Sequence, residues 1–258
     1  AAPGPWFALV NHMEPHLPYR PPESVRRRLA RSAPSAGALA SARAAGSHEA
    51  LLHAVGAAPL DRERLDLLSE LYDAEIATLD AELGSLFDAL RASGALDRTI
   101  VVIVGDHGEL LGEDGLLGHR FSLHRAVRHV PLLIRWPGAF DGGRVVDDVV
   151  RLEDVPVTVL ELLGRAFPGT SDGASLSGGP TGRIARVVQG SVPEPFAEGM
   201  LRLAEGRDVG SLLQGRSAVY DGRFHLIRDD DGTRRLFDVR ADPDQLHDLS
   251  AESPDDLA

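Results

Sequence analysis

A carboxylate and an imidazole follow directly on an apolar, strand-like run in Val104-Gly105-Asp106-His107-Gly108. In open α/β sheets, ligands bind beyond the carboxyl ends of the strands, so we expect both side chains to face a pocket. The flanking glycines allow the sharp turn that lets two adjacent residues reach one ion. A carboxylate oxygen with an imidazole nitrogen suits Mn²⁺, Zn²⁺ or Mg²⁺, and suits Ca²⁺ less well because of the nitrogen. The alternative is a turn in which Asp106 caps a helix and His107 is an ordinary surface residue.

Two further histidines lie near the ends of strand-like segments. His119 follows a Gly-Glu-Asp-Gly turn, and His16 lies shortly after the apolar run at residues 6–10. If the two strands are neighbours, both imidazoles approach the same crevice, where they would bind an anionic ester or protonate its leaving oxygen. A lone histidine is more often structural, and that alternative stays open for each. We interpret His124 and His129 as structural.

Three segments of the first half have the pattern of regular elements that would position these side chains. Residues 6–10 have the pattern of a short buried strand, and residues 26–58 that of a surface excursion with some helix. Asp61 as N-cap and Gly94 just past the end predict a helix between them. Its apolar stripe consists of Leu65, Leu68, Tyr72, Ile76, Leu79, Leu83, Leu86 and Leu90. Residues 99–104 form a β-branched run typical of a strand covered on both faces.

The second half of the chain predicts a different kind of sheet at its end. Residues 130–135 have the pattern of another strand of the first sheet, and residues 154–163 that of a helix closed by Gly164. After the Gly, Ser and Pro-rich loop at 165–182, three short segments with turn signals between them predict an antiparallel meander: 217–220, 224–228 and 235–238. We therefore expect an α/β fold, with a mostly parallel sheet between helices and a small C-terminal antiparallel sheet.

Composition excludes several classes of function for these 258 residues. The 27 basic against 39 acidic side chains give a formal net charge of −12, which argues against a nucleic-acid surface. No apolar run approaches the roughly 18 residues that a membrane-spanning helix needs. Cysteine is absent, so these residues contain no disulfide, thiolate metal site or cysteine nucleophile.

The order and spacing of several motifs together resemble the sulfatase family of the alkaline phosphatase superfamily. The run from residue 72 to residue 138 resembles the C-terminal part of that family's catalytic domain. It contains a tyrosine-and-aspartate-bearing helix, the strand with its Gly-Asp-His-Gly motif, a Gly-Glu-x-Gly-x-x-Gly-His segment at 112–119 and a Val-Pro-Leu strand from 130 to 138. Residues 11–19 resemble the family's Asn-x-x-x-x-His-x-Pro-Tyr segment. Residues 223–228 and 236–243 resemble its closing hairpin.

This resemblance implies specific roles for four residues. Asp106 and His107 would be metal ligands, and His16 and His119 would be catalytic and substrate-binding residues that contact the ester's anionic oxygens or its leaving group. The implied cofactor is a divalent metal ion, Ca, Mn, Mg or Zn. The implied substrate is a small-molecule or glycan sulfate ester. Residues 1–165 would belong to the catalytic domain and 166–258 to a C-terminal antiparallel subdomain, and family members are often periplasmic or extracellular.

The sequence also departs from the family pattern. The family's nucleophile is a Cys or Ser in a Cys/Ser-x-Pro-x-Arg motif, or a Thr or Ser in phospho-transferring relatives, and it lies upstream of the segment found here. Residues 32–35, Ser-Ala-Pro-Ser, lack the arginine and lie in the wrong place. We therefore expect a sulfate ester hydrolase fragment without its N-terminal half. The alternatives are a phosphoric ester hydrolase or phosphoglycerol transferase of the same superfamily, and a non-catalytic relative.

Overall fold

The computed structural model describes residues 4–179 and 182–252. The chain divides into two compact units, each assembled from several stretches of sequence. Unit 1 takes the described residues up to Thr99, together with Glu109–Arg120 and Glu198–Val209. Unit 2 takes Ile100–Gly108, Phe121–Ala197 and the described residues from Gly210 onward. The expected domain boundary at residue 165 is a different division of the chain and stays a prediction.

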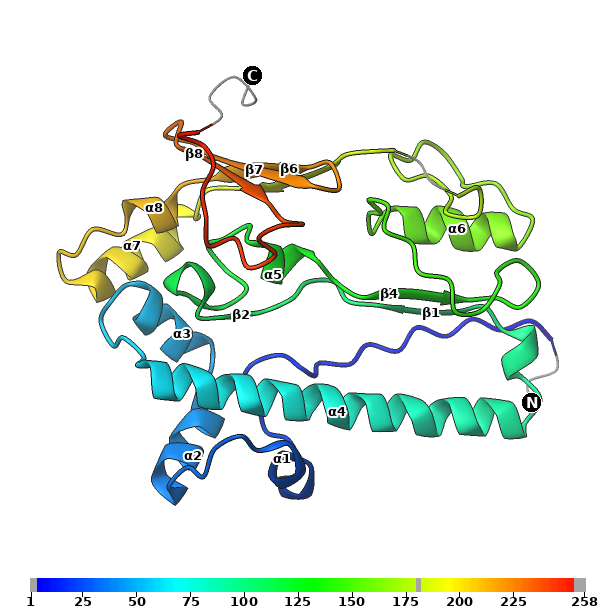
Figure 1. Cartoon of the computed structure of the whole chain (residues 1–258), viewed down its shortest axis with the longest axis horizontal. Helices are drawn as coiled ribbons and strands as arrows, with labels where there is room; N and C mark the ends of the chain where they lie inside the picture. The colour runs from blue at the N-terminus through cyan, green and yellow to red at the C-terminus, as the bar shows by residue number, and fades with distance from the viewer. Residues whose placement is uncertain (1–3, 180–181, 253–258) are drawn as a thin grey trace. The chain divides into compact units, whose positions relative to one another are not determined.

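Unit 1 is built on α4 (Arg62–Ala92), a helix of 31 residues (Figure 1). It begins at Asp61, whose Oδ1 accepts a hydrogen bond from the Arg64 backbone N–H at 2.9 Å. Gly94 follows its end with φ +67°, the left-handed conformation that glycine adopts at little cost. Both predicted helix ends are therefore confirmed. Despite its length α4 carries too many charges to cross a membrane, and no other helix of the described residues is long and apolar enough to do so.

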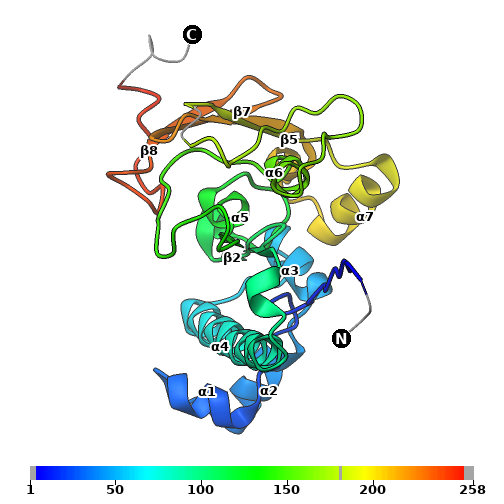
Figure 2. The same cartoon turned by 90° about the vertical axis from the view of Figure 1, so that its right-hand side faces the viewer.

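Short helices occupy the excursion predicted over residues 26–58. They are α1 (Glu23–Leu29), α2 (Ala36–Ala44) and α3 (Ser47–Ala54), and α1 and α2 pack against α4 (Figure 2). A single turn, η1 (Leu96–Arg98), follows α4. The buried core of this unit combines side chains from the segment before α1, from α2 and the residue after it, from α4 and from position 117: Leu17, Tyr19, Ala42, Ala45, Leu67, Leu68, Leu71 and Leu117.

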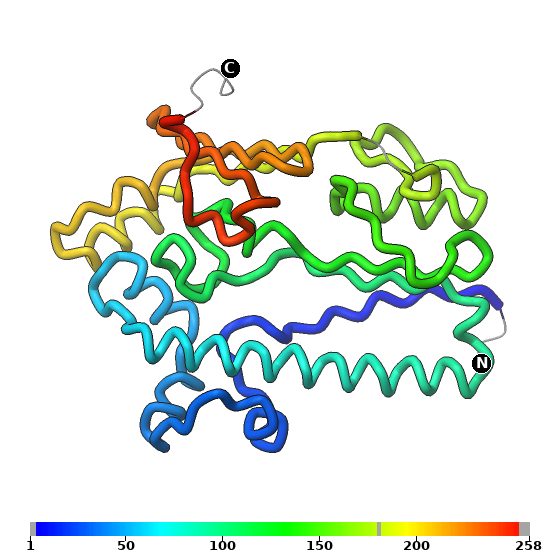
Figure 3. The backbone as a smooth tube through the Cα atoms, in the orientation of Figure 1, coloured from blue at the N-terminus to red at the C-terminus, as the bar shows by residue number. Residues whose placement is uncertain are grey.

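The predicted buried strand at residues 6–10 is wrong for this chain. The tube in Figure 3 shows the segment in blue as an extended run, and it belongs to no strand. Phe7 and Leu9 are 85% and 84% exposed, although both are strongly apolar. An extended segment becomes a strand only when a neighbour satisfies its backbone N–H and C=O groups, and no described strand pairs with this one.

Unit 1 also contains a short hairpin with strands of two residues each. Its strands are β2 (Leu110–Leu111) and β3 (Leu117–Gly118), which pair antiparallel across the turn η2 (Glu113–Gly115). Leu110 is fully buried and Leu117 belongs to the core around α4. Burial of these two leucines attaches the hairpin to the rest of the unit.

The predicted strands at 99–104 and 130–135 form a pair in unit 2. They are β1 (Val101–Val104) and β4 (Leu132–Arg135), joined antiparallel with Val101 opposite Arg135. Coverage of the first run on both faces is wrong, because all of β1 is partly exposed and Val104 is 42% exposed. The physical reason is that β1 has one hydrogen-bonded neighbour among the described strands. The parallel neighbours expected for the larger sheet are not among those strands either.

The predicted C-terminal meander is confirmed in unit 2. The sheet has the order β5 (Ala185–Gln189), β6 (Arg216–Tyr220), β7 (Phe224–Asp229) and β8 (Arg234–Asp238), all antiparallel. The sequence pattern did not predict a strand at the position of β5. The core of this unit combines Leu123, Ala218, Ile227, Phe237 and Val239.

The remaining helices are short. They are α5 (Arg125–Arg128) and α6 (Asp154–Leu162) in unit 2, α7 (Glu194–Ala204), which has residues in both units, and α8 (Gly210–Leu213). α6 matches the predicted helix, and Gly164 follows its end with φ +67°. His124 is the N-cap of α5 and His129 its C-cap, in keeping with their structural interpretation. Helices and strands together make this a mixed α/β chain with a small antiparallel sheet at its C-terminal end.

Candidate functional site

Glu109 and His119 lie opposite each other at the open end of the unit 1 hairpin. β2 and β3 pair with Leu110 opposite Gly118, so the next residues outward, Glu109 and His119, are brought together by the same register. Gly118 has φ +88°, which lets the chain leave β3 sharply. The Nδ1 atom of His119 lies 2.8 Å from Oε1 of Glu109, a strong hydrogen bond.

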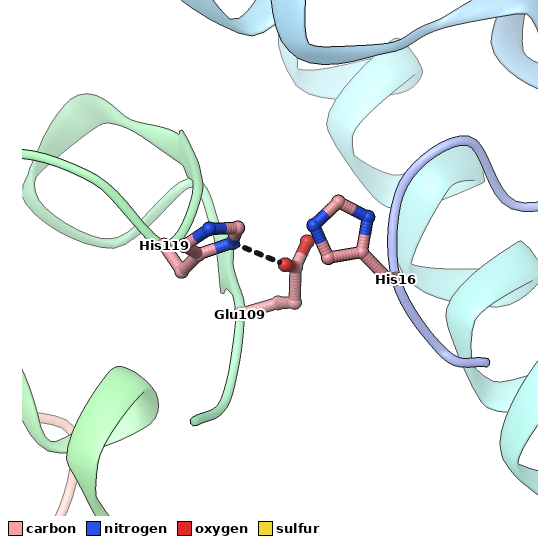
Figure 4. Close-up of side chains that lie close together, drawn as sticks. All are labelled: His16, Glu109 and His119. Carbon is pink, nitrogen blue, oxygen red and sulfur yellow. Dashed lines mark hydrogen bonds and ion pairs between the residues drawn. The ribbon is translucent and has the colours of Figure 1, made fainter. Parts of the chain in front are cut away.

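His16 reaches the same place from the loop before α1. Its ring centroid lies 5.1 Å from that of His119, and Figure 4 shows the Glu109 carboxylate between the two imidazoles. Nδ1 of His16 is 2.6 Å from the backbone oxygen of Leu17, whose side chain is buried in the core. Because a carbonyl oxygen only accepts, Nδ1 of His16 carries its proton. We call His16, Glu109 and His119 the histidine cluster.

Glu109 is a buried carboxylate that also accepts a hydrogen bond from outside the histidine cluster. Its side chain is 3% exposed, and its Oε2 accepts from the hydroxyl of fully buried Tyr19 at 2.7 Å. Burial, with the nearby charge of Glu109, raises the pKa of Tyr19 far above its ordinary value, and burial raises that of Tyr72. Both phenols therefore stay protonated, and the Tyr19 hydroxyl remains a donor.

The histidine cluster also has the donor set of a metal site. One ligand atom from each of its three residues lies within 4.8 Å of the others. Two imidazole nitrogens and a carboxylate oxygen suit Zn²⁺, Mn²⁺ or Fe²⁺. However, an ion would have to compete with the hydrogen bonds that already occupy both oxygens of Glu109.

Asp106 and His107, the two predicted metal ligands, follow β1 in unit 2. The Asp106 side chain is 89% exposed and that of His107 is 33% exposed. Oδ1 of Asp106 accepts from the His107 backbone N–H at 3.0 Å, and it lies 3.9 Å from Nε2 of the same residue. Because the Asp106 side chain is largely exposed, its carboxylate can turn toward an ion held by His107, so this residue pair fits part of a divalent-ion site.

The backbone around these two residues is tightly fixed. Gly105 N–H donates to the Pro131 carbonyl at 3.1 Å, and Gly108 N–H donates to that of Val127 at 2.6 Å. A Cβ on Gly108 would fall on the carbonyl oxygen of Ala126. Glycine is therefore required at this position by close approach of the backbone. We call Gly105–Gly108 the Asp-His turn.

The structure brings together two of the four predicted site residues, His16 and His119. Asp106 and His107 lie side by side in the Asp-His turn, and a crevice shared with the two histidines stays a prediction. Sequence reasoning missed Glu109 and Tyr19. The hairpin signal was present in the glycines at 112, 115 and 118, because a short hairpin centred on this turn places residues 109 and 119 opposite each other.

Comparison with known proteins gives consistent matches. The sulfatase family model matches residues 1–165. Arylsulfatase K of Bos taurus is 32% identical over 187 residues, which cover 71% of this chain and 33% of that protein. N-acetylglucosamine-6-O-sulfatase of Bacteroides thetaiotaomicron is 34% identical over 180 residues, covering 69% of this chain and 31% of that protein. The chain thus spans about a third of the length of the curated relatives it matches.

A solved structure agrees with these matches at the level of the fold. The phosphonate monoester hydrolase of Agrobacterium radiobacter is similar with a TM-score of 0.72 and 26% identity, over 97% of this chain and 54% of that one. The family model alone covers well over half of the described residues. On this basis the chain belongs to the sulfatase family.

Proposed function

We propose that this chain is the C-terminal part of a hydrolase of sulfate esters. The observation that carries the proposal is the histidine cluster, in which His16 and His119 from distant segments place their rings 5.1 Å apart beside a buried carboxylate. Two imidazoles so placed can contact the anionic oxygens of one sulfate group. The relatives named arylsulfatase and N-acetylglucosamine-6-O-sulfatase support sulfate over other anions.

The proposed roles within the chain follow from hydrogen bonding. Nδ1 of His16 is committed to the Leu17 carbonyl and Nδ1 of His119 to Glu109, so Nε2 is the nitrogen of each ring that exchanges a proton with substrate. For these roles each ring must be the imidazolium, which carries a second proton on Nε2. One histidine would then hold a sulfate oxygen through Nε2–H, and the other would donate its Nε2 proton to the leaving oxygen and be left neutral with Nδ1–H. General acid catalysis of this kind contributes typically about 10²- to 10⁴-fold in rate.

Asp106 and His107 are the proposed ligands of a divalent ion, Ca, Mn, Mg or Zn. Such an ion would supply positive charge to the transferred group when it is bound. Most of the ion's remaining ligands would come from elsewhere in the intact protein, because the Asp-His turn offers only two donors. In this chain alone the affinity for such an ion would therefore be weak.

We propose that the nucleophile lies in an N-terminal half outside these residues. The chain has no cysteine, and it spans about a third of its curated relatives. The exposed apolar run at 6–10 and the pairing of β1 with one neighbour among the described strands are what missing strands would leave behind. Residues 1–165 would then complete the catalytic domain, and 166–258 would form its C-terminal subdomain.

Phosphorus esters are the second candidate substrate class. The similarity to a phosphonate monoester hydrolase over 97% of this chain favours them specifically. Sulfate and phosphonate or phosphate esters present similarly shaped anions, so the histidine cluster alone does not choose between them. For the sulfate esters, we propose sulfated glycans as the natural substrates, because the name of the Bacteroides relative contains a sulfated amino sugar.

The test is an assay of the parent protein, extended upstream through a nucleophile motif, on an aryl sulfate and on an aryl phosphonate. We expect metal-dependent turnover, with a higher kcat/KM for the sulfate. His16→Ala and His119→Ala should each lower kcat by about 10²-fold or more. Turnover by the 258-residue chain alone would contradict the missing nucleophile, and a parent inert on both substrates would favour a non-catalytic relative.

A further inference from the structure

The buried carboxylate of Glu109 has no assigned part in ester hydrolysis. Its side chain is 3% exposed and accepts two hydrogen bonds, from His119 through Oε1 and from Tyr19 through Oε2. Burying a charged carboxylate is costly unless each of its oxygens is satisfied. Two strong hydrogen bonds, one to each oxygen, provide that compensation. The fold therefore positions Glu109 specifically between these two partners.

The hydrogen bonds define where the protons lie. The Tyr19 hydroxyl donates to one oxygen, and Nδ1 of His119 lies within hydrogen-bond distance of the other. An ionised carboxylate has only acceptors, so a ring nitrogen paired with it must be the donor. Nδ1 of His119 therefore carries a proton, and Nε2 is its second nitrogen.

We propose that Glu109 is a positioning residue that fixes the tautomer and the orientation of the His119 ring. Its hydrogen bond holds the proton on Nδ1, and its charge balances the positive charge that the ring carries when Nε2 is also protonated and donates to an anionic oxygen. The structural part of the inference stands on the contacts of Glu109. The consequence for turnover rests on the proposed function.

Tyr19 completes this arrangement by holding the carboxylate in place. It is fully buried in the unit 1 core, and its ring meets that of Tyr72 edge to face, with centroids 5.4 Å apart. Its hydroxyl therefore approaches Glu109 from a fixed direction. The result is a chain of three side chains, from the α4 core through Tyr19 and Glu109 to His119.

The direct test is long-range ¹H–¹⁵N NMR of the imidazoles in the 258-residue chain, at a pH where they are neutral. His119 is assigned by the loss of its cross-peaks in His119→Asn. We expect the Nδ1–H tautomer in the wild-type chain. It should persist in Glu109→Gln, since an amide oxygen still accepts from Nδ1. In the double variant Glu109→Leu with Tyr19→Phe, which leaves no buried hydroxyl without an acceptor, the proton should move to Nε2.

The second test measures kcat and KM in the parent enzyme. Glu109→Gln keeps the ring in place but removes the charge, so kcat should fall by about 10- to 100-fold with KM changed less than about threefold. Glu113→Gln is the matched control, because Glu113 is a carboxylate of the same hairpin whose Oε2 accepts from the Leu111 N–H. We expect it to leave kcat unchanged.

The two tests separate the inference from the proposed function. An Nε2–H tautomer in the wild-type chain, or an Nδ1–H tautomer that survives in the folded double variant, would overturn the role of Glu109. Equal losses of kcat in Glu109→Gln and Glu113→Gln would also overturn it. If the parent hydrolyses neither ester, the proposed function fails, while the NMR spectra still decide the tautomer.

Discussion

The histidine cluster of unit 1 and the Asp-His turn of unit 2 differ in which of their parts is held in place. In the histidine cluster a side chain is fixed, since Glu109 is 3% exposed and both its oxygens accept hydrogen bonds. In the Asp-His turn the backbone is fixed by two hydrogen bonds, while the Asp106 side chain is 89% exposed.

This difference separates two ways of preparing a functional group. The histidine cluster is organised by hydrogen bonds and ring contacts within its own unit. The Asp-His turn only delivers donor atoms, whose final arrangement an ion and further ligands would complete. Substitutions in the histidine cluster should therefore affect both stability and activity, whereas side-chain substitutions in the Asp-His turn should affect activity alone.

The largest expected effect is that of Asp106→Ala on activity. In the parent protein this substitution should lower metal-dependent kcat/KM by at least about 10²-fold, because a proposed metal ligand is lost. The free energy of unfolding of the chain should change by less than about 0.5 kcal/mol, since the side chain is exposed. Asp141→Ala, at another exposed aspartate of unit 2, is the control for activity. If Asp106→Ala is as active as this control, the proposal that the Asp-His turn binds a metal ion is wrong.

A smaller effect, this time on stability, is expected for Gly108→Ala. The new Cβ would collide with the Ala126 carbonyl oxygen, and the backbone must move, at a cost of about 3 kcal/mol measured by urea unfolding. Gly84→Ala in α4 is the matched control, because no atom lies within 4 Å of its Cβ position. That change should stabilise the chain by about 0.5–1 kcal/mol. Equal stability of the two variants would show that the backbone of the Asp-His turn is not constrained.

A further expected effect, on the pH dependence of stability, comes from His225, which extends the comparison to a fully buried histidine. It is fully buried in β7, and Gln245 lies 2.9 Å from its Nδ1. Burial, followed by the charge of Arg128, lowers its pKa from 6.5 to about 3. Between these values the unfolded chain binds more protons than the folded chain. Its contribution to stability is therefore complete above pH 6.5 and is lost as pH falls toward 3, by at most about 1.4 kcal/mol per unit.

The measurement is urea unfolding between pH 3 and pH 7 for the wild-type chain and for His225→Leu. Carboxylates also titrate in this range, so the difference between the two proteins carries the information. We expect the wild-type chain to lose more stability on acidification than the variant. Identical pH dependence would mean that His225 titrates alike in the folded and unfolded chains.

Local patterns in the sequence were sufficient for several elements. The apolar stripe with Asp61 and Gly94 predicted α4 to within a residue at each end, because capping and periodicity act over a few residues. The turn signals at Asp221-Gly222 and before Gly232 likewise predicted the meander. Motif resemblance identified the family from residues that each had an ordinary structural alternative.

Tertiary structure alone decided which apolar runs are covered and which polar groups from distant segments meet. The runs at 6–10 and 99–104 have sequences typical of buried strands, yet burial depends on neighbours that local pattern does not specify. The hydrogen bond between Tyr19 and Glu109 also depends on neighbours that local pattern does not specify. The sequence determined the residue types and the hairpin that sets Glu109 beside His119, whereas packing of the segment before α1 brought Tyr19 and His16 to them. A hydrogen bond between distant residues depends on the path of the whole chain, and no local periodicity encodes that path.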